Sequence, residues 1–185
     1  QSVRALLFDT AGRLVDKEKV EYRPYFSRRP GWAEQDPEVW WKGLCDAVTG
    51  LKIRRTGEFT SLLGTGITTQ RDSMIHLDRE GNPLRPALLW LDQRKAAPVY
   101  HPRGLTRLVY SLVGMKEAIY KTQVDGKGNW VRQYEPETWE KTCKYAQVSG
   151  FLNRRLTGEF KDSAASQIGH IPFNYKKTRW AKQTE

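Results

Sequence analysis

The residue types best suited to chemistry lie in two short segments of the chain, 69–74 and 89–94. The first contains Arg71 and Asp72 and the second contains Trp90, each next to an apolar run that is typical of a strand. A guanidinium and a carboxylate can hydrogen-bond hydroxyl groups, and an indole offers a flat face to C–H groups. We therefore predict that two strand ends meet here and form a cradle for a polyhydroxylated, sugar-like molecule.

The elements that must position these segments alternate between strands and helices, as in an α/β domain. Asp36 is a good N-cap and Pro37 suits the first helical position, so a helix is predicted from Pro37 to about Gly50. Turn-forming residues separate the apolar runs on either side of this helix. Strands are expected at 3–8, 14–22, 61–69, 74–77 and 84–91.

After residue 105 the apolar residues recur at helical spacing, so the second half of the chain is predicted to be mainly helical. Ser149 and Gly150 are expected to end the last of these helices. Helices are expected at 105–113, 118–120, 129–134 and 136–148.

The composition indicates one folded domain without a membrane span. The chain has 185 residues, of which 28% are charged, and no apolar run approaches the roughly 20 residues needed to cross a bilayer. Cys45 and Cys143 lie far apart and outside any metal-binding spacing, so both are expected to be buried, reduced thiols. We expect a cytoplasmic protein with no membrane partner.

The net charge of +10 raises the question of a nucleic-acid partner, because basic surfaces concentrate polyanions. The basic residues are spread along the chain, and the densest cluster lies at 176–179. The pairs at 28–29 and 54–55 fall in predicted turns. Solvated surface charge is therefore favoured over a nucleic-acid docking surface.

Other groups that could carry chemistry are better explained by structural roles. His76, His101 and His170 are dispersed, and no Ser/His/Asp or metal-ligand spacing links them. We expect surface or hydrogen-bonded histidines and no metal site. Asp9 follows a strand, where Asp commonly bonds the backbone of a turn, so a structural role is favoured over that of a general base.

Taken in order, six segments of the chain resemble the amino-terminal domain of the FGGY family of carbohydrate kinases, which includes glycerol kinase and xylulokinase. The resemblance covers nearly the whole chain and implies a ribonuclease H-like, actin-like ATPase fold, with a mixed sheet flanked by helices. It also implies that residues 1–185 form a partial amino-terminal domain, incomplete at both ends, and that a second, ATP-binding domain lies outside this chain. The matching segments are 2–9, 30–37 with Trp40, 66–72, 90–94, 127–130 and 156–158 with Asp162.

The resemblance implies a substrate-binding role for residues of both chemistry-bearing segments. Arg71 and Asp72, which follow Gln70, would hydrogen-bond substrate hydroxyls. Trp90 would pack on the carbon skeleton of the substrate, with Asp92 and Arg94 behind it. The predicted substrate-binding residues are therefore Arg71, Asp72, Trp90, Gln70 and Asp92. Glycerol kinases carry Glu where this chain has Asp72, so the carboxylate here stands on a side chain one methylene shorter. A core aromatic residue at a strand end is an equally good interpretation of Trp90, and this alternative stays open.

The resemblance places the catalytic parts of the enzyme outside residues 1–185. It implies an Asp-x-Gly-Thr phosphate loop just before Gln1 and a general-base Asp beyond Glu185. The complete enzyme would transfer the γ-phosphate of ATP, with Mg²⁺, to a hydroxyl of a sugar or polyol, and we expect the isolated 185 residues to be inactive. The alternative, from another class, is a truncated, non-catalytic carbohydrate-binding or regulatory module. Assembly as a homo-oligomer is left open.

Overall fold

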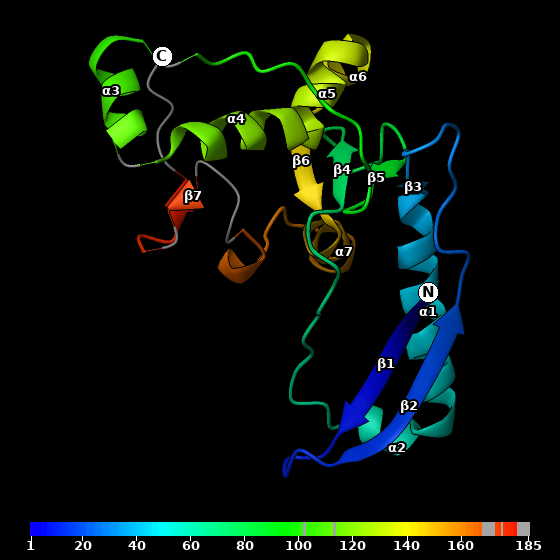
Figure 1. The fold of residues 1–185 in the computed structure, drawn as a ribbon. Helices are drawn as coiled ribbons and strands as arrows, with labels where there is room; N and C mark the ends of the chain where they lie inside the picture. The colour runs from blue at the N-terminus through cyan, green and yellow to red at the C-terminus, as the bar shows by residue number, and fades with distance from the viewer. Residues whose placement is uncertain (102, 113, 168–172, 175, 181–185) are drawn as a thin grey trace.

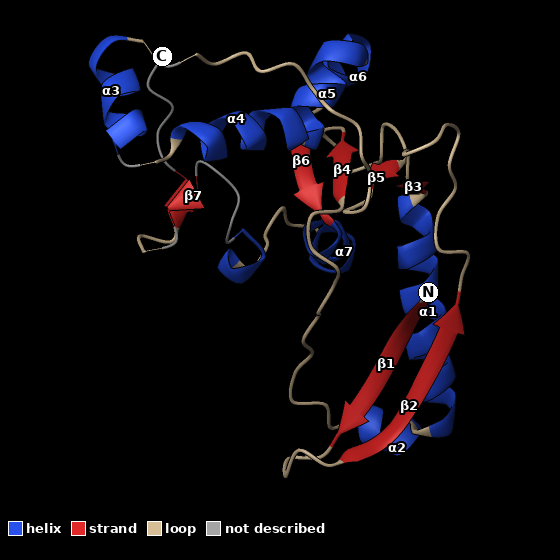
Figure 2. Ribbon diagram, in the orientation of Figure 1, coloured by secondary structure: helices blue, strands red, loops and turns tan. Residues whose placement is uncertain are grey.

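The computed structural model describes residues 1–101, 103–112, 114–167, 173–174 and 176–180, and places a hairpin and one long helix beside a four-stranded sheet (Figures 1 and 2). The strands are β1 (Ser2–Phe8), β2 (Leu14–Glu21), β3 (Glu34–Gln35), β4 (Met74–Leu77), β5 (Ala87–Leu88), β6 (Lys144–Gln147), β7 (Phe173–Asn174) and β8 (Arg179–Trp180). The helices are α1 (Pro37–Arg54), α2 (Thr56–Phe59), α3 (Gly104–Leu112), α4 (Lys116–Asp125), α5 (Lys127–Tyr134), α6 (Pro136–Lys141) and α7 (Val148–Thr157), with a 3₁₀ helix at Ala164–Gln167.

The described strands form three sheets, in the orders β1-β2, β3-β5-β4-β6 and β7-β8. Every strand pair among them is antiparallel. The α/β architecture is confirmed, but the mixed sheet implied by the resemblance is not assembled within the described residues, because the strands there are joined as antiparallel neighbours.

The hairpin of β1 and β2 packs against α1 (Figure 1). The helix begins as predicted, because Asp36 Oδ1 accepts a hydrogen bond from the Glu38 N–H at 3.0 Å and Pro37 occupies the first turn. Gly43 lets the helix approach β1 closely, since a Cβ there would lie 2.9 Å from Val3 Cγ2. A side chain at Gly43 would therefore push the helix away from the hairpin.

The end of α1 lies at Arg54, beyond the predicted end at Gly50. Arg54 and Arg55, predicted to lie in a turn, instead join the helix to β2. Arg55 Nε lies 3.0 Å from Asp16 Oδ2, and Arg54 binds Glu18. Hydrogen bonds from Arg55 and Arg54 lower the pKa of Asp16 to about 2. The basic pair therefore fastens the helix to the hairpin.

The four-stranded sheet is covered on both faces. On one face Ile75 of β4 packs with Trp40 of α1 and Phe151 of α7, all of them buried. On the other face Leu88 of β5 packs with Trp130 of α5. Burying one large apolar side chain stabilises a fold by about 1.5–3 kcal/mol, so these two clusters fix the sheet that carries the predicted site.

Two predicted strands differ from the structure. Residues 61–69 form no strand, and Leu63 is 89% exposed. No described strand pairs with this segment, and a strand without a partner is not stable in water. The strand predicted over 84–91 is reduced to β5, because Pro86 lacks the N–H that a sheet requires.

The helix predicted over 136–148 is wrong in its second half. The helix α6 ends at Lys141, β6 follows, and Ser149 and Gly150 lie in the first turn of α7 instead of ending a helix. Residues 144–147 pair with β4 along its whole length. A partner distant in the sequence therefore overrides the local helical pattern.

The isolated cysteines are less buried than predicted. Cys45 is half-buried and Cys143 is exposed, and both are free. Cys143 lies just before the edge strand β6, where side chains reach solvent. Among the histidines, His101 is exposed, and His170 lies outside the described residues.

His76 is fully buried in β4 and hydrogen-bonded through one ring nitrogen, so the structure agrees with the second of the two predicted alternatives, a surface or a hydrogen-bonded histidine. Its Nδ1 lies 3.1 Å from Thr142 Oγ1, and Nδ1 must carry the proton because that hydroxyl donates to the Thr138 carbonyl. Its Nε2 has no hydrogen-bond partner among the described residues. Burial, together with the charge of Arg85, lowers the pKa of His76 to about 4.

The buried, neutral His76 predicts a loss of stability in mild acid. Because its folded-state pKa of about 4 lies below the ordinary value of 6.5, the unfolded chain takes up the proton first as the pH falls from 6.5 towards 4. The free energy of unfolding should fall by about 2 kcal/mol between pH 7.5 and pH 5 from this group alone. Urea unfolding of the wild type and of His76→Gln at both pH values measures the difference. The same pH dependence in both proteins would contradict the prediction.

Candidate substrate site

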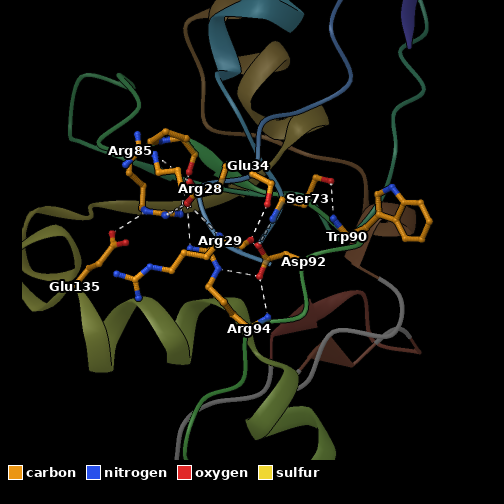
Figure 3. Close-up of polar contacts among 12 residues, drawn as sticks. Arg28, Arg29, Glu34, Ser73, Arg85, Trp90, Asp92, Arg94 and Glu135 are labelled. Carbon is orange, nitrogen blue, oxygen red and sulfur yellow. Dashed lines mark hydrogen bonds and ion pairs between the residues drawn. The ribbon is translucent and has the colours of Figure 1, made fainter. Parts of the chain in front are cut away.

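The two segments singled out in the sequence meet at one end of the four-stranded sheet. Met74 of β4 pairs with Leu88 of β5, so the residues before β4 lie beside those after β5. The buried Ser73 Oγ accepts hydrogen bonds from Gln70 Nε2 at 3.1 Å and from the Trp90 N–H at 3.2 Å (Figure 3). The structure therefore brings the two strand ends together, as predicted. The hydrogen bond from Gln70 to Ser73 stabilises the loop that precedes β4.

Arg71 and Asp72 are exposed immediately before β4. Asp72 has a φ of +58°, a left-handed conformation that Asp adopts more readily than most residues. Its backbone N lies 3.3 Å from Oε1 of Gln147, the last residue of β6, and Lys127 Nζ donates to its Oδ2 at 2.7 Å. A third strand end and the start of α5 therefore fix both the backbone and the carboxylate of Asp72.

Trp90 is 58% exposed, and its indole points away from the charged side chains behind it (Figure 3). A core aromatic residue would be buried, so Trp90 is not part of the core that residues 1–185 form. The indole instead presents a surface on which the C–H groups of a ligand can pack.

Behind the exposed indole, a buried network of charged side chains ties this loop to β3 (Figure 3). Asp92 accepts hydrogen bonds from the Ala33 N–H and from Arg94, both at 2.7 Å. Glu34 Oε1 accepts from Arg94 at 3.1 Å and from Arg85 at 2.5 Å. Desolvation raises the pKa of Asp92, but the hydrogen bonds from Arg94 and Ala33 outweigh it and leave the pKa below its ordinary value. The Asp92 carboxylate thus binds groups inside the protein and supports the Trp90 loop.

The guanidinium of Arg94 packs on two indoles that contact each other edge to face. Its Cζ is 4.1 Å from the centre of the Trp32 ring and 4.5 Å from that of Trp130. Trp130 follows Lys127 by one helical turn in α5, so the helix that carries Lys127 is anchored at the buried network. Because of this spacing, Trp130 fixes the helix in the core while Lys127 reaches Asp72.

Four residues that build this site were not predicted from the sequence. They differ in whether the sequence contains a pattern that could have pointed to them. Glu34 and Lys127 both lie in segments that resemble the family, but their partners are distant in the sequence. Ser73 lies next to Asp72 and gives no sign that it bridges two strands. Gln147 carried no signal, because it falls in a segment predicted to be helical.

The described residues contain no group of three His, Cys, Asp or Glu side chains that could hold a metal ion. No residue of this part of the chain is therefore assigned to Mg²⁺, which prefers carboxylate oxygens. The only helix described with as many as 18 residues is α1, and none of the described helices combines the length and the apolar character of a membrane span.

Residues 1–184 match the model of the FGGY family of carbohydrate kinases, N-terminal domain. The match, together with the architecture, defines this domain as the amino-terminal domain of that family. The chain belongs to the FGGY family.

Known relatives are kinases of a polyol and of a sugar. The glycerol kinase of Thermococcus onnurineus is 29% identical over 184 residues, which cover 97% of this chain and 37% of that protein. The xylulose kinase of Lactococcus lactis is 26% identical over 186 residues, which cover 98% of this chain and 36% of that protein. The chain thus spans little more than a third of the length of these relatives.

Solved structures share the fold. A xyloylose kinase from Brucella ovis matches with a TM-score of 0.79 and 27% identity, over 97% of this chain and 36% of that one. The Plasmodium falciparum glycerol kinase with ADP matches with a TM-score of 0.72 and 21% identity, over 98% of this chain and 37% of that one. The ribonuclease H-like fold class predicted from the sequence is therefore confirmed.

Proposed function

We propose that this chain is the acceptor-binding part of an ATP-dependent kinase that phosphorylates a hydroxyl of a sugar or polyol. The observation that carries the proposal is the position of Asp72 and the exposed Trp90 at one end of the sheet, in a member of a carbohydrate kinase family. A carboxylate and an uncovered indole at the same end of a sheet offer both kinds of contact that a polyhydroxylated molecule needs.

Each predicted site residue has a role in this proposal. Arg71 and Asp72 hydrogen-bond hydroxyls of the acceptor, and Trp90 packs on its carbon skeleton. Gln70 and Asp92 support these residues from behind. Gln70 donates to Ser73, and Asp92 accepts from Arg94 and from the Ala33 N–H just before β3. Holding the acceptor in one orientation is a large part of what a protein contributes to phosphoryl transfer.

ATP would supply the phosphoryl group, and Mg²⁺ would neutralise charge on its phosphates. The described residues are not assigned to either, and this chain's part in the reaction is to bind and orient the acceptor hydroxyl. A cytoplasmic location and a small-molecule acceptor, with neither nucleic acid nor membrane as partner, belong to the same proposal. Homo-oligomer assembly stays a prediction.

The test of this function is acceptor-dependent release of ADP by the natural polypeptide that contains residues 1–185. The acceptors are a panel of polyols, ketoses and aldoses, each assayed with ATP and Mg²⁺. Release with one class of acceptor would support the proposal. No release with any acceptor, from protein that is folded by circular dichroism, would favour the non-catalytic carbohydrate-binding module instead.

Removing the indole should weaken acceptor binding. In Trp90→Ala the KM for the acceptor is expected to rise about tenfold, because packing one aromatic face against C–H groups contributes about 1.5 kcal/mol. Steady-state kinetics with varied acceptor measures this change. The matched control is Phe8→Ala, which removes an aromatic side chain of similar exposure, 54%, at the far end of the hairpin (Figure 1). An unchanged KM in Trp90→Ala would remove Trp90 from the acceptor site.

A further inference from the structure

Lys127 makes a close ion pair with the carboxylate of the acceptor site. Its Nζ lies 2.7 Å from Asp72 Oδ2, and the two residues are on different elements, since Lys127 begins α5 and Asp72 precedes β4. The Lys127 side chain is only 8% exposed, whereas that of Asp72 is 53% exposed. The ammonium therefore approaches the carboxylate from the protein side and leaves its outer side open to a ligand.

The position of Lys127 is fixed by the packing around it. Trp130, one turn further along α5, is buried against Trp32 and Arg94. Tyr145 of β6 lies over the start of the helix, where its Cζ is 3.3 Å from the place that a Cβ of Gly128 would occupy. The missing side chain at Gly128 thus permits Tyr145 to pack against the start of the helix.

A second contact fixes the residue that carries the carboxylate. Asp72 is also held at its backbone by Gln147, in a left-handed conformation that few other residues adopt easily. With its backbone fixed and Oδ2 bound to Lys127, the carboxylate can turn little, which leaves Oδ1 as its oxygen for a ligand.

We propose that Lys127 is a positioning residue of the acceptor site, which holds the Asp72 carboxylate so that Oδ1 accepts the hydrogen bond from an acceptor hydroxyl. The inference rests on the proposed function, and it adds a residue that acts through Asp72 without touching the acceptor. A neutral polyol suits this arrangement, because the lysine already balances the charge of the carboxylate.

A double-mutant cycle on the natural polypeptide that contains this chain tests the inference. The variants are Lys127→Met, Asp72→Asn and the double variant, each assayed for kcat and KM of the acceptor found in the ADP-release panel. Lys127→Met is expected to lower kcat/KM for the acceptor about tenfold through a raised KM and a lowered kcat. In the Asp72→Asn background the same change should cost less than about twofold, because the group through which Lys127 acts is already altered. Lys127→Arg should restore part of the loss.

The matched control is another lysine–aspartate pair, Lys42 and Asp46 on α1, whose Nζ and Oδ2 lie 2.6 Å apart on the exposed face of the helix. Lys42→Met, Asp46→Asn and their double variant should leave kcat/KM unchanged. Urea unfolding of every variant shows whether it is folded, and Lys127→Gln takes the place of Lys127→Met if the latter is not.

The outcomes separate this inference from the proposed function. If the wild type turns over and folded Lys127→Met has the same kcat and KM, the role of Lys127 is overturned and the proposed kinase function stands. Losses that multiply fully in the double variant would also overturn it, because Lys127 would then act independently of Asp72. A wild type without turnover on any acceptor would overturn the proposed function itself, and the inference with it.

Discussion

Replacing Glu34 by alanine is expected to lower the free energy of unfolding by about 3–5 kcal/mol, which is a large part of the stability of an ordinary domain. Glu34 Oε1 lies 2.5 Å from Arg85 and 3.1 Å from Arg94, and all three side chains are buried. Removing the carboxylate leaves two guanidinium groups without their shared partner in a region that water does not reach. Urea unfolding monitored by tryptophan fluorescence at pH 7.5 measures the change.

The control for Glu34→Ala is Glu38→Ala, which breaks a glutamate–arginine pair on the surface. Glu38 binds Arg155, and its side chain is 44% exposed, so water replaces the lost partner. This variant is expected to change the free energy of unfolding by at most about 1 kcal/mol. A similar small effect in both variants would mean that the network around Glu34 is hydrated in solution and does not hold the Trp90 loop.

The site could be predicted from the sequence where its geometry follows from neighbouring elements. The strands that precede Trp90 and follow Asp72 are joined by a tight turn, and antiparallel strands joined in this way place those two residues at the same end of the sheet. The start of α1 could be predicted for the same reason, since Asp36 and Pro37 act on the adjacent turn of the chain.

The parts that could not be predicted depend on partners distant in the sequence. Lys127 and Asp72 are 55 residues apart, and Arg94 and Glu34 are 60 residues apart, so no local pattern records either contact. The same holds for β6, whose residues suit a helix until β4 pairs with them. Residues 61–69 show the opposite case, in which a strand-like pattern finds no described partner and stays irregular.

Removing the Asp72 carboxylate should have the largest effect on catalysis. In Asp72→Ala, kcat/KM for the acceptor is expected to fall about 100-fold, because a hydrogen bond to a charged group contributes about 1.5–3 kcal/mol and the covered ammonium of Lys127 loses its partner. Both a raised KM and a lowered kcat are expected, since the carboxylate binds the acceptor and also orients its hydroxyl. Steady-state ADP release with varied acceptor separates the two.

A second variant of the same residue decides whether a loss in Asp72→Ala comes from the carboxylate or from the backbone at this position. Alanine at a φ of +58° is strained, whereas Asp72→Asn keeps a residue that adopts this conformation and removes only the charge. A loss of similar size in Asp72→Asn would therefore assign the effect to the carboxylate. Asp46→Ala, which breaks the matched lysine pair on α1, should leave kcat/KM unchanged. Full activity in both Asp72 variants would show that the acceptor is bound elsewhere, because a site built around this carboxylate cannot lose it without a measurable loss of turnover.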